Sequence, residues 1–290
     1  MDSFIAKKTK EVFGEEFELF SFERLLGGAQ KHTYLAKCTN GFEFVIYQWD
    51  KSTTFFEDNT ESAVFCSSSA HLFQCNNELM RSHGIRTPKL FYMDKSRKEK
   101  DFEYAFVEFI RGKDMDYIME KEPERLPEVL ESLHDSIHRM HGIRSTVIGQ
   151  VDRMQHTDFD IIEYTLMGIH QNSMYIQKVD REYADIYIQV ESQAKDCAQK
   201  LEKRKKYTFI HGELGPNHVI VDKDNNAYLI DIEGAKYCDV EEELSFLDMR
   251  FNKILKEAES GVDEQRMFFY YIGHCMGNLR GALELRQKGY

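Results

Sequence analysis

Residues 207–247 read YTFIHGELGPNHVIVDKDNNAYLIDIEGAKYCDVEEELSFL, and this segment carries the clearest structural signal in the chain. It places Glu213 just after one predicted strand, His218 five residues later, and Asp231 at the end of a predicted hairpin. These three side chains can converge because a hairpin returns the chain to where it began. One carboxylate can orient or deprotonate a hydroxyl group while the other two residues hold a divalent cation. The segment therefore favours a reaction on a phosphate group.

Upstream of this segment, the first hundred residues predict mainly β-strands. The Asn40-Gly41 pair is a strong hairpin signal, and Gly27-Gly28 predicts a tight turn in which the backbone could approach a ligand closely. The pattern predicts a five-stranded antiparallel sheet with one helix inserted after the third strand. The expected strands cover residues 20–26, 32–38, 42–49, 89–93 and 102–109, and the expected helix covers 70–82.

The pattern changes after residue 110, where helical periodicity replaces alternation. Expected helices cover residues 124–140, 159–174, 183–203, 240–257 and 264–288, with short strands at 207–210, 219–221 and 227–230. No flexible linker separates the two patterns. We therefore expect two lobes, residues 1–110 and 111–290, that pack over a cleft.

The motifs HGELGPNHVIVD (residues 211–222) and DIEG (231–234) resemble those of the aminoglycoside phosphotransferase family. That family has H-G-D, a short loop, an Asn or His, a hairpin and then an Asp-led tripeptide. The resemblance covers about residues 20–250. It implies an α+β, bilobal, protein-kinase-like fold with a small antiparallel β N-lobe (1–110) and a larger, mostly helical C-lobe (111–290).

The resemblance also implies roles for individual residues. Glu213 stands where the family has its catalytic aspartate, and His218 and Asp231 stand for the ligands of Mg²⁺. The phosphoryl donor would be ATP or GTP. The sequence does not choose between the two nucleotides.

The nucleotide itself would contact the N-terminal lobe. Gly27 and Gly28 would lie over its phosphates, and the backbone from Glu108 to Ile110 would meet adenine or guanine. No G-x-x-x-x-G-K-[ST] sequence is present, which removes P-loop enzymes from consideration.

Acidic residues near the metal-binding turn are candidates for contact with the substrate. Glu233 could bind substrate or face solvent, and Asp239 and Glu242 could line an acidic pocket for an amine-bearing molecule. The structural alternative for residues 241–243 is that acidic side chains at the start of a helix favour its dipole.

Three departures from the family pattern bear on activity. Glu213 is longer than an aspartate, Tyr47 replaces the lysine that binds nucleotide, and the helix residue that would pair with this lysine, near 71–74, is not acidic. Lys37 on the neighbouring strand could reach the site. A catalytically degenerate, kinase-like binding protein is therefore an alternative, and a kinase for a small metabolite such as an amino alcohol or a sugar is another.

Composition limits the partners and the compartment. The chain has 290 residues, 50 acidic against 38 basic, with a net charge of −12, which excludes a general nucleic-acid surface. Six scattered cysteines without a C-x-x-C pair suggest reduced thiols in a cytoplasmic protein. No stretch reaches the 18 apolar residues of a membrane span. We expect a small-molecule hydroxyl substrate, with cationic molecules as candidates, and no nucleic-acid or membrane partner; the oligomeric state stays open.

Overall fold

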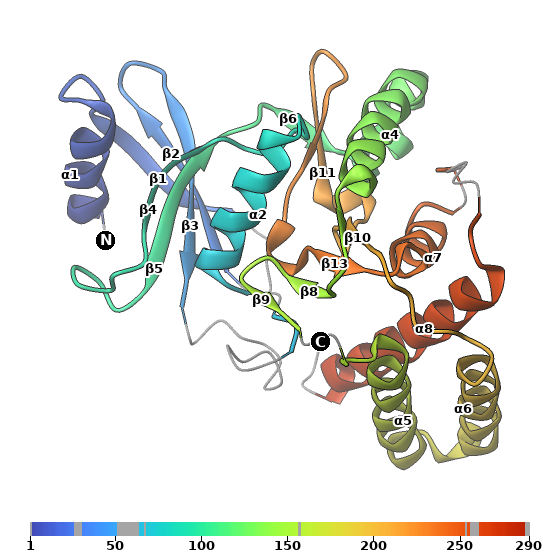
Figure 1. Cartoon of the computed structure of the whole chain (residues 1–290). Helices are drawn as coiled ribbons and strands as arrows, with labels where there is room; N and C mark the ends of the chain where they lie inside the picture. Colours follow the sequence, from blue (N-terminus) through green and yellow to red (C-terminus); the bar gives the residue numbers. More distant parts are fainter. Residues whose placement is uncertain are drawn as a thin grey trace. The chain divides into compact units, whose positions relative to one another are not determined.

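The computed structural model describes residues 2–25, 31–50, 64–66, 68–155, 158–252, 254–255 and 261–287. The chain forms two compact units that interleave along the sequence (Figure 1). The first comprises Met1–Met140, Gln150–Arg153 and Pro216–Ala235. The second comprises His141–Gly149, Met154–Gly215 and Lys236–Tyr290.

The first unit contains the predicted five-stranded antiparallel sheet, with strand order β1-β2-β3-β5-β4 (Figure 1). Gly41, with φ of 82°, makes the predicted tight turn between the second and third strands. The sequence prediction of this sheet is confirmed. Its strands are β1 (Leu19–Arg24), β2 (His32–Cys38), β3 (Glu43–Trp49), β4 (Leu90–Asp94) and β5 (Glu103–Glu108).

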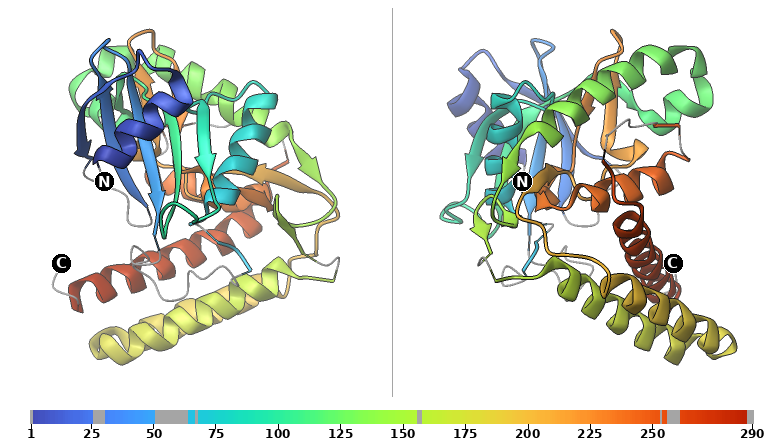
Figure 2. Two further views of the ribbon diagram at one scale, coloured as in Figure 1. Left: turned by 90° about the vertical axis from the view of Figure 1, so that its left-hand side faces the viewer. Right: turned by 45° about the vertical axis from the view of Figure 1, so that its right-hand side comes forward.

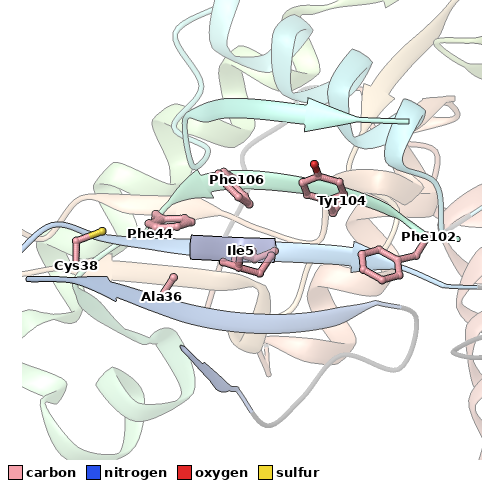
Figure 3. Close-up of a cluster of buried hydrophobic side chains, with 8 residues drawn as sticks. Ile5, Ala36, Cys38, Phe44, Phe102, Tyr104 and Phe106 are labelled. Carbon is pink, nitrogen blue, oxygen red and sulfur yellow. The ribbon is translucent and has the colours of Figure 1, made fainter. Parts of the chain in front are cut away.

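One face of this sheet packs against α1 (Asp2–Phe13), a helix that the sequence analysis does not predict. Alternate residues of β3 point to this side, because side chains in a strand alternate between the two faces. Ile5 of the helix lies among the aromatic side chains of β3 and β5 (Figure 3). The cluster consists of Ile5, Ala36, Cys38, Phe44, Ile46, Phe102, Tyr104 and Phe106.

The opposite face of the sheet carries the other residues of β3. Tyr47 and Trp49 contact Phe73 of α2 (Ala70–Ser82), with ring centroids 5.3 and 5.7 Å apart. The helix begins where the Ser69 side chain accepts a hydrogen bond from the backbone of the first turn. Its bounds confirm the predicted helix, and its buried side turns toward the face that carries the candidate site.

The remainder of the first unit is a three-stranded sheet with strand order β12-β11-β6 and two helices. Because β6 pairs with β11, the residues just after position 110 cluster with the hairpin and with the N-terminal sheet. The compact units therefore do not follow the predicted boundary at 110. The elements are β6 (Gly112–Asp114), α3 (Met115–Lys121), α4 (Leu126–Gly142), β11 (Val219–Asp222) and β12 (Ala227–Leu229), with 3-10 turns at Pro123–Arg125, Pro216–His218 and Ile232–Gly234.

In its described residues, the second unit combines short strands with four helices. Strand β10 pairs with β7 and with β13. Helices α5 and α6 lie side by side and both contact α8 (Figure 2). The strands are β7 (Arg144–Ser145), β10 (Tyr207–Ile210) and β13 (Lys236–Cys238). Strands β8 (Gly149–Gln150) and β9 (Arg153–Met154) each have one residue in this unit and one in the first. The helices are α5 (Ile161–Val179), α6 (Ala184–Ala198), α7 (Val240–Arg250) and α8 (Glu264–Gln287), with a 3-10 turn at Arg181–Tyr183.

The four helices of the second unit confirm the predicted ones, although α7 ends at Arg250 rather than at residue 257. The chain leaves the helix at Phe251, and Asn252 adopts a left-handed backbone conformation with φ of 49°. Among the described residues, no helix combines the length and the apolar character that a bilayer crossing requires.

Candidate functional site

The β11–β12 hairpin brings His218 and Asp231 together. His218 closes the 3-10 turn before β11, and Asp231 follows β12 after one residue. The backbone N–H of Ile230 donates to the carbonyl of His218 at 3.0 Å. The side chains then meet, with 3.4 Å between His218 Nε2 and Asp231 Oδ2. The convergence expected for these two residues is confirmed.

The backbone at Asp231 turns the carboxylate outward. Its φ and ψ of 60° and 45° lie in the left-handed region, which Asp adopts more readily than most residues, at a cost of about 1 kcal/mol. The following residues, Ile232 and Glu233, are buried, whereas the Asp231 side chain is 40% exposed. Strained backbone of this kind clusters at functional sites.

The donors at this point fit a divalent metal that arrives together with phosphates. Mg²⁺ is usually held by one or two carboxylates, water and substrate phosphate oxygens, and the exposed Asp231 carboxylate is such a ligand. His218 offers an imidazole nitrogen, which suits softer metals better than Mg²⁺. Within the described part of the chain, no group of three or more His, Cys, Asp or Glu side chains could hold a metal. Phosphate oxygens would therefore have to complete the coordination.

Lys31, which the sequence analysis does not identify, lies at the centre of this site. Its Nζ donates to Asp231 Oδ1 at 2.5 Å and to Glu233 Oε1 at 2.6 Å. The same atom lies 4.9 Å from the centroid of the Tyr47 ring. Burial alone would lower the pKa of Lys31, but the charges of Asp231 and Glu233 outweigh it and hold the pKa above its usual value. Lys31 therefore stays charged although its side chain is only 9% exposed.

The hairpin register explains how Lys31 reaches this point. Thr33 pairs with Tyr47 across β2 and β3, so Lys31, two residues earlier, lies on the same face of the sheet. The Asn40-Gly41 turn sets this register, and applying it to the sequence could have found Lys31. Lys37 does not serve the site, because it pairs with Glu23 and Glu43 at 3.5 and 3.9 Å.

Tyr47 itself is buried beneath the Lys31 ammonium group. Burial raises the pKa of the Tyr47 phenol to about 12, so the hydroxyl stays protonated at neutral pH. The position at which the family carries its nucleotide-binding lysine thus holds a neutral aromatic ring that packs under a lysine from the neighbouring strand.

Glu233 does not face substrate or solvent, which corrects the prediction for this residue. Its side chain is 2% exposed, and Oε1 accepts hydrogen bonds from Lys31 and from Trp49 Nε1, the latter at 3.3 Å. Burial raises the pKa of the Glu233 carboxyl, and the charge of Lys31 opposes this effect. The physical reason is the 3-10 turn after Asp231, which directs the Glu233 side chain inward, toward Lys31 and Trp49.

The helix residue that faces the metal-binding turn is Asn76. Its amide donates to the Ile232 carbonyl at 2.7 Å and is itself fully buried. The sequence analysis expects the residue that faces this turn near 71–74, and the structure brings Asn76 there instead. Gln150 contacts the same turn, since its amide lies 3.3 Å from the Glu233 carbonyl. Two uncharged amides therefore hold the backbone of the turn in place.

Of the residues expected to contact nucleotide, Glu108 and Ile110 lie in the described part of the first unit. Glu108 ends β5, and its N–H donates to the Lys89 carbonyl at 2.8 Å while its carboxylate accepts from the Lys89 N–H at 3.0 Å. Ile110 is half-buried between β5 and β6. Their contact with a base stays a prediction. Gly27 and Gly28 lie outside the described residues.

In the second unit, Glu213 lies on the loop after β10 with an exposed side chain. Gly212, with φ of 86°, donates its N–H to the buried Glu243 carboxylate at 2.8 Å. The Glu213 N–H points to His211 Nδ1 at 3.4 Å. Burial raises the pKa of Glu243, which the Gly212 N–H partly offsets. The buried Glu243 carboxylate thus fixes the backbone of this loop at Gly212, and the Glu213 side chain remains exposed.

Asp239 is enclosed in an ion pair rather than open to substrate, which corrects the prediction for this residue. Its side chain is fully enclosed, and Oδ2 accepts hydrogen bonds from Arg266 at 2.5 Å and from the Tyr270 hydroxyl at 2.8 Å. Both partners come from α8. The acidic group therefore ties the start of α7 to this helix.

Glu242 does line a pocket, of about 260 Å³, between α5, α7 and α8. Its Oε1 accepts a hydrogen bond from Lys236 Nζ at 2.7 Å. Burial would raise the pKa of Glu242, but Lys236 outweighs it and lowers the pKa, so the carboxylate stays ionised. The wall also contains aromatic and polar residues, among them Tyr164, Asn172, Tyr270 and His274, and the apolar residues Met167 and Ile169.

Comparisons with known proteins agree with this geometry. A model described as the phosphotransferase enzyme family matches residues 69–258, a segment that includes Glu213, His218 and Asp231. A search of curated protein sequences finds no significant match.

Solved structures of similar fold cover nearly the whole chain. A thermostable mutant of aminoglycoside phosphotransferase APH(4)-Ia, in complex with AMP-PNP and hygromycin B, has a TM-score of 0.64 at 14% identity over 98% of this chain and 92% of that one. The choline kinase LicA from Streptococcus pneumoniae has a TM-score of 0.61 at 19% identity, covering 100% and 92%. Spectinomycin phosphotransferase APH(9)-Ia, in complex with ADP and spectinomycin, has 0.62 at 13%, covering 96% and 86%.

The identities to these structures are low, so their likeness shows the fold, whereas the family match extends over more than half of the chain. The two findings agree with the motifs at 211–222 and 231–234. This chain belongs to the phosphotransferase enzyme family of the aminoglycoside phosphotransferases and has its protein-kinase-like fold.

Proposed function

We propose that this protein transfers the γ-phosphoryl group of ATP or GTP to a hydroxyl group of a small molecule. The observation that carries the proposal is the Asp231 carboxylate, which is exposed, lies 3.4 Å from His218 and follows a left-handed backbone turn. Structures of similar fold contain AMP-PNP or ADP together with a small-molecule substrate.

Asp231 and His218 would hold Mg²⁺ on the nucleotide phosphates. The metal, when bound, neutralises phosphate charge that a protein with net charge −12 would otherwise repel. Phosphoryl transfer needs little covalent chemistry from the protein, so positioning and charge stabilisation supply most of the rate.

Glu213 would orient the acceptor hydroxyl and take its proton. Its loop continues directly into the 3-10 turn that carries His218, and the Gly212–Glu243 hydrogen bond limits the freedom of this loop. The additional methylene of Glu, relative to the family's aspartate, extends the carboxylate by about 1.5 Å, which is large against the reach of a hydrogen bond. The acceptor would therefore bind farther from the loop backbone than an aspartate would require.

The Glu242 pocket favours an amine-bearing acceptor. A carboxylate with tyrosine rings around it can attract a cationic group through charge and through the ring faces. Lys236 neutralises part of this attraction, because it already donates to Glu242. Aminoglycosides and amino alcohols are the first acceptors to screen.

Thermal unfolding with ATP or GTP, each with and without Mg²⁺, tests the nucleotide site. Nucleotide at about 100 times its Kd should add about 2.7 kcal/mol and raise Tm by roughly 5–10 °C. The Mg²⁺-dependent part of the shift should disappear in Asp231→Asn. A wild-type protein that shows no Mg²⁺-dependent shift at millimolar nucleotide would contradict the proposal.

The role of Glu213 needs a separate measurement. Once an acceptor is found, Glu213→Gln should lower kcat by about 10²- to 10⁴-fold, because it removes the proton acceptor. Nucleotide affinity should stay within twofold of wild type, approximately. Glu243→Gln serves as a matched control for a carboxylate that supports the loop from beneath, and equal turnover in Glu213→Gln and wild type would refute the assignment.

A further inference from the structure

We propose that Lys31 binds the phosphates of the nucleotide in place of the strand lysine that Tyr47 replaces, and that the arriving metal takes Asp231 away from it. The inference rests on the proposed function and assigns to that site its phosphate-binding cation. The family match begins at residue 69 and does not include Lys31, which lies immediately before β2.

The position of Lys31 is the first argument. The β2–β3 register places it on the face of the sheet that carries Tyr47, and its ammonium group lies 4.9 Å from the ring centroid. The Lys31 side chain, which comes from the neighbouring strand, thus places its ammonium group over the Tyr47 ring, at the position where the family has its lysine. From there, Nζ reaches both carboxylates of the metal-binding turn, at 2.5 and 2.6 Å.

The acidic partner of the lysine has moved as well. In the family pattern this partner comes from the helix, but here the helix supplies Asn76, whose amide binds the backbone carbonyl of Ile232. Glu233 from the turn supplies the buried carboxylate instead, and Trp49 donates to the same oxygen at 3.3 Å. Both members of the ion pair therefore come from other positions than in the family pattern. Lys31 supplies the cation and Glu233 the anion, so the site still holds a complete ion pair.

The two carboxylates around Lys31 differ in access, and this difference predicts an exchange. Glu233 is 2% exposed and Asp231 is 40% exposed. A metal at Asp231 needs carboxylate oxygens, one of which Lys31 now occupies at 2.5 Å. When metal and phosphates enter together, Asp231 can pass to the metal and Lys31 to the phosphates, while Glu233 retains the lysine on the buried side.

A purely structural role for Lys31 would have different consequences. In that case the lysine only neutralises Glu233, and its loss would lower stability without changing the preference for metal or nucleotide. The exchange instead predicts that loss of Lys31 has opposite effects on two binding affinities. The affinity for free metal should rise, because Lys31 competes with the metal for Asp231, and the affinity for nucleotide should fall, because Lys31 binds its phosphates.

The test uses Lys31→Met in the full chain. Mg²⁺–ATP binding, measured by calorimetry, should weaken by about 10- to 100-fold, the size expected for loss of a hydrogen bond between charged groups. Mn²⁺ binding to the nucleotide-free protein, measured by electron paramagnetic resonance, should become tighter, because Asp231 is released. Lys37→Met is the matched control on the same strand, with a 39% exposed lysine, and should change neither value.

Two further variants keep the test decisive. In Lys31→Met/Tyr47→Lys, a lysine returns to the strand position, and nucleotide affinity should recover by at least tenfold, approximately. If Lys31→Met does not fold, Lys31→Met/Glu233→Gln removes the stranded buried charge and should show the same loss of nucleotide affinity.

Failure of this inference can be told from failure of the proposed function. If wild type binds Mg²⁺–ATP and Lys31→Met binds it equally well, Lys31 is not the phosphate-binding residue, although the enzyme assignment stands. Unchanged Mn²⁺ affinity in Lys31→Met would overturn the exchange at Asp231. If wild type binds neither ATP nor GTP with Mg²⁺, both proposals are overturned.

Discussion

Two clusters of buried opposite charges among the described residues, one from each unit, differ in how completely they are enclosed. In the first unit Lys31 holds Asp231 and Glu233, and in the second Arg266 holds Asp239. Both contain an ion pair of 2.5 Å. Asp231, however, is 40% exposed, whereas the Asp239 side chain is fully enclosed. The enclosed cluster stabilises its unit, and the open cluster can exchange a partner for a ligand.

The largest expected effect comes from breaking the enclosed cluster. Arg266→Leu removes the close cation of the buried Asp239 carboxylate, which keeps Arg204 at 3.9 Å and the Tyr270 hydroxyl, and we expect a loss of about 3–5 kcal/mol in the free energy of unfolding. Urea unfolding of the purified protein measures this. Arg280→Leu is the control, because its pair with Glu284 is more exposed and should contribute less than about 1 kcal/mol. Similar losses in both variants would contradict the distinction.

A smaller effect is expected from the corresponding change in the open cluster. Glu233→Gln removes one of two carboxylates around Lys31, but the lysine keeps Asp231 and the glutamine can still accept hydrogen bonds. We expect a loss of about 1–2 kcal/mol in the same urea experiment. A loss as large as that of Arg266→Leu would mean that the open cluster is as essential to folding as the enclosed one.

The smallest effect concerns pH and the half-buried His274, which lines the Glu242 pocket. Burial is the main cause that lowers the pKa of His274 below its usual 6.5, although Glu242 opposes it. The folded state therefore takes up this proton only at lower pH than the unfolded chain does. Its contribution to stability is complete above about pH 6.5 and is lost as the pH falls through the folded pKa. Tm should decline less between pH 7.5 and 5 in His274→Gln than in wild type, and parallel curves would contradict this.

Local signals explain what could be predicted from the sequence. Some signals depend only on neighbours in the chain: the Asn40-Gly41 turn, the alternating pattern of the strands, and an Asp that follows an apolar strand. These signals were enough to predict the five strands, α2 and the His218–Asp231 pair. Helix α1 was missed, although Ile5 and Phe13 contact the sheet, because it combines these residues with several lysines.

Long-range partners explain what could not be predicted. Asp239 and Glu242 look alike in the sequence, and only Arg266 and Tyr270 from α8 decide that Asp239 is enclosed. The sequence predicts that Glu233 binds substrate or faces solvent, because nothing near it in the chain indicates that Lys31 lies against it. The role of a charged residue depends on its counter-ion. The motif position of the family's lysine does not reveal Lys31, because this lysine comes from a different strand.

The long sequence separation between Lys31 and its counter-ions has a consequence for biosynthesis. Asp231 follows Lys31 by 200 residues, and Glu233 follows it by 202. At a synthesis rate of 5–20 residues per second, the ribosome needs roughly 10–40 s to make this interval. The N-terminal sheet therefore emerges with a lysine directed at a position that no carboxylate yet occupies. The Lys31 ammonium group must therefore stay hydrated until the β11–β12 hairpin arrives.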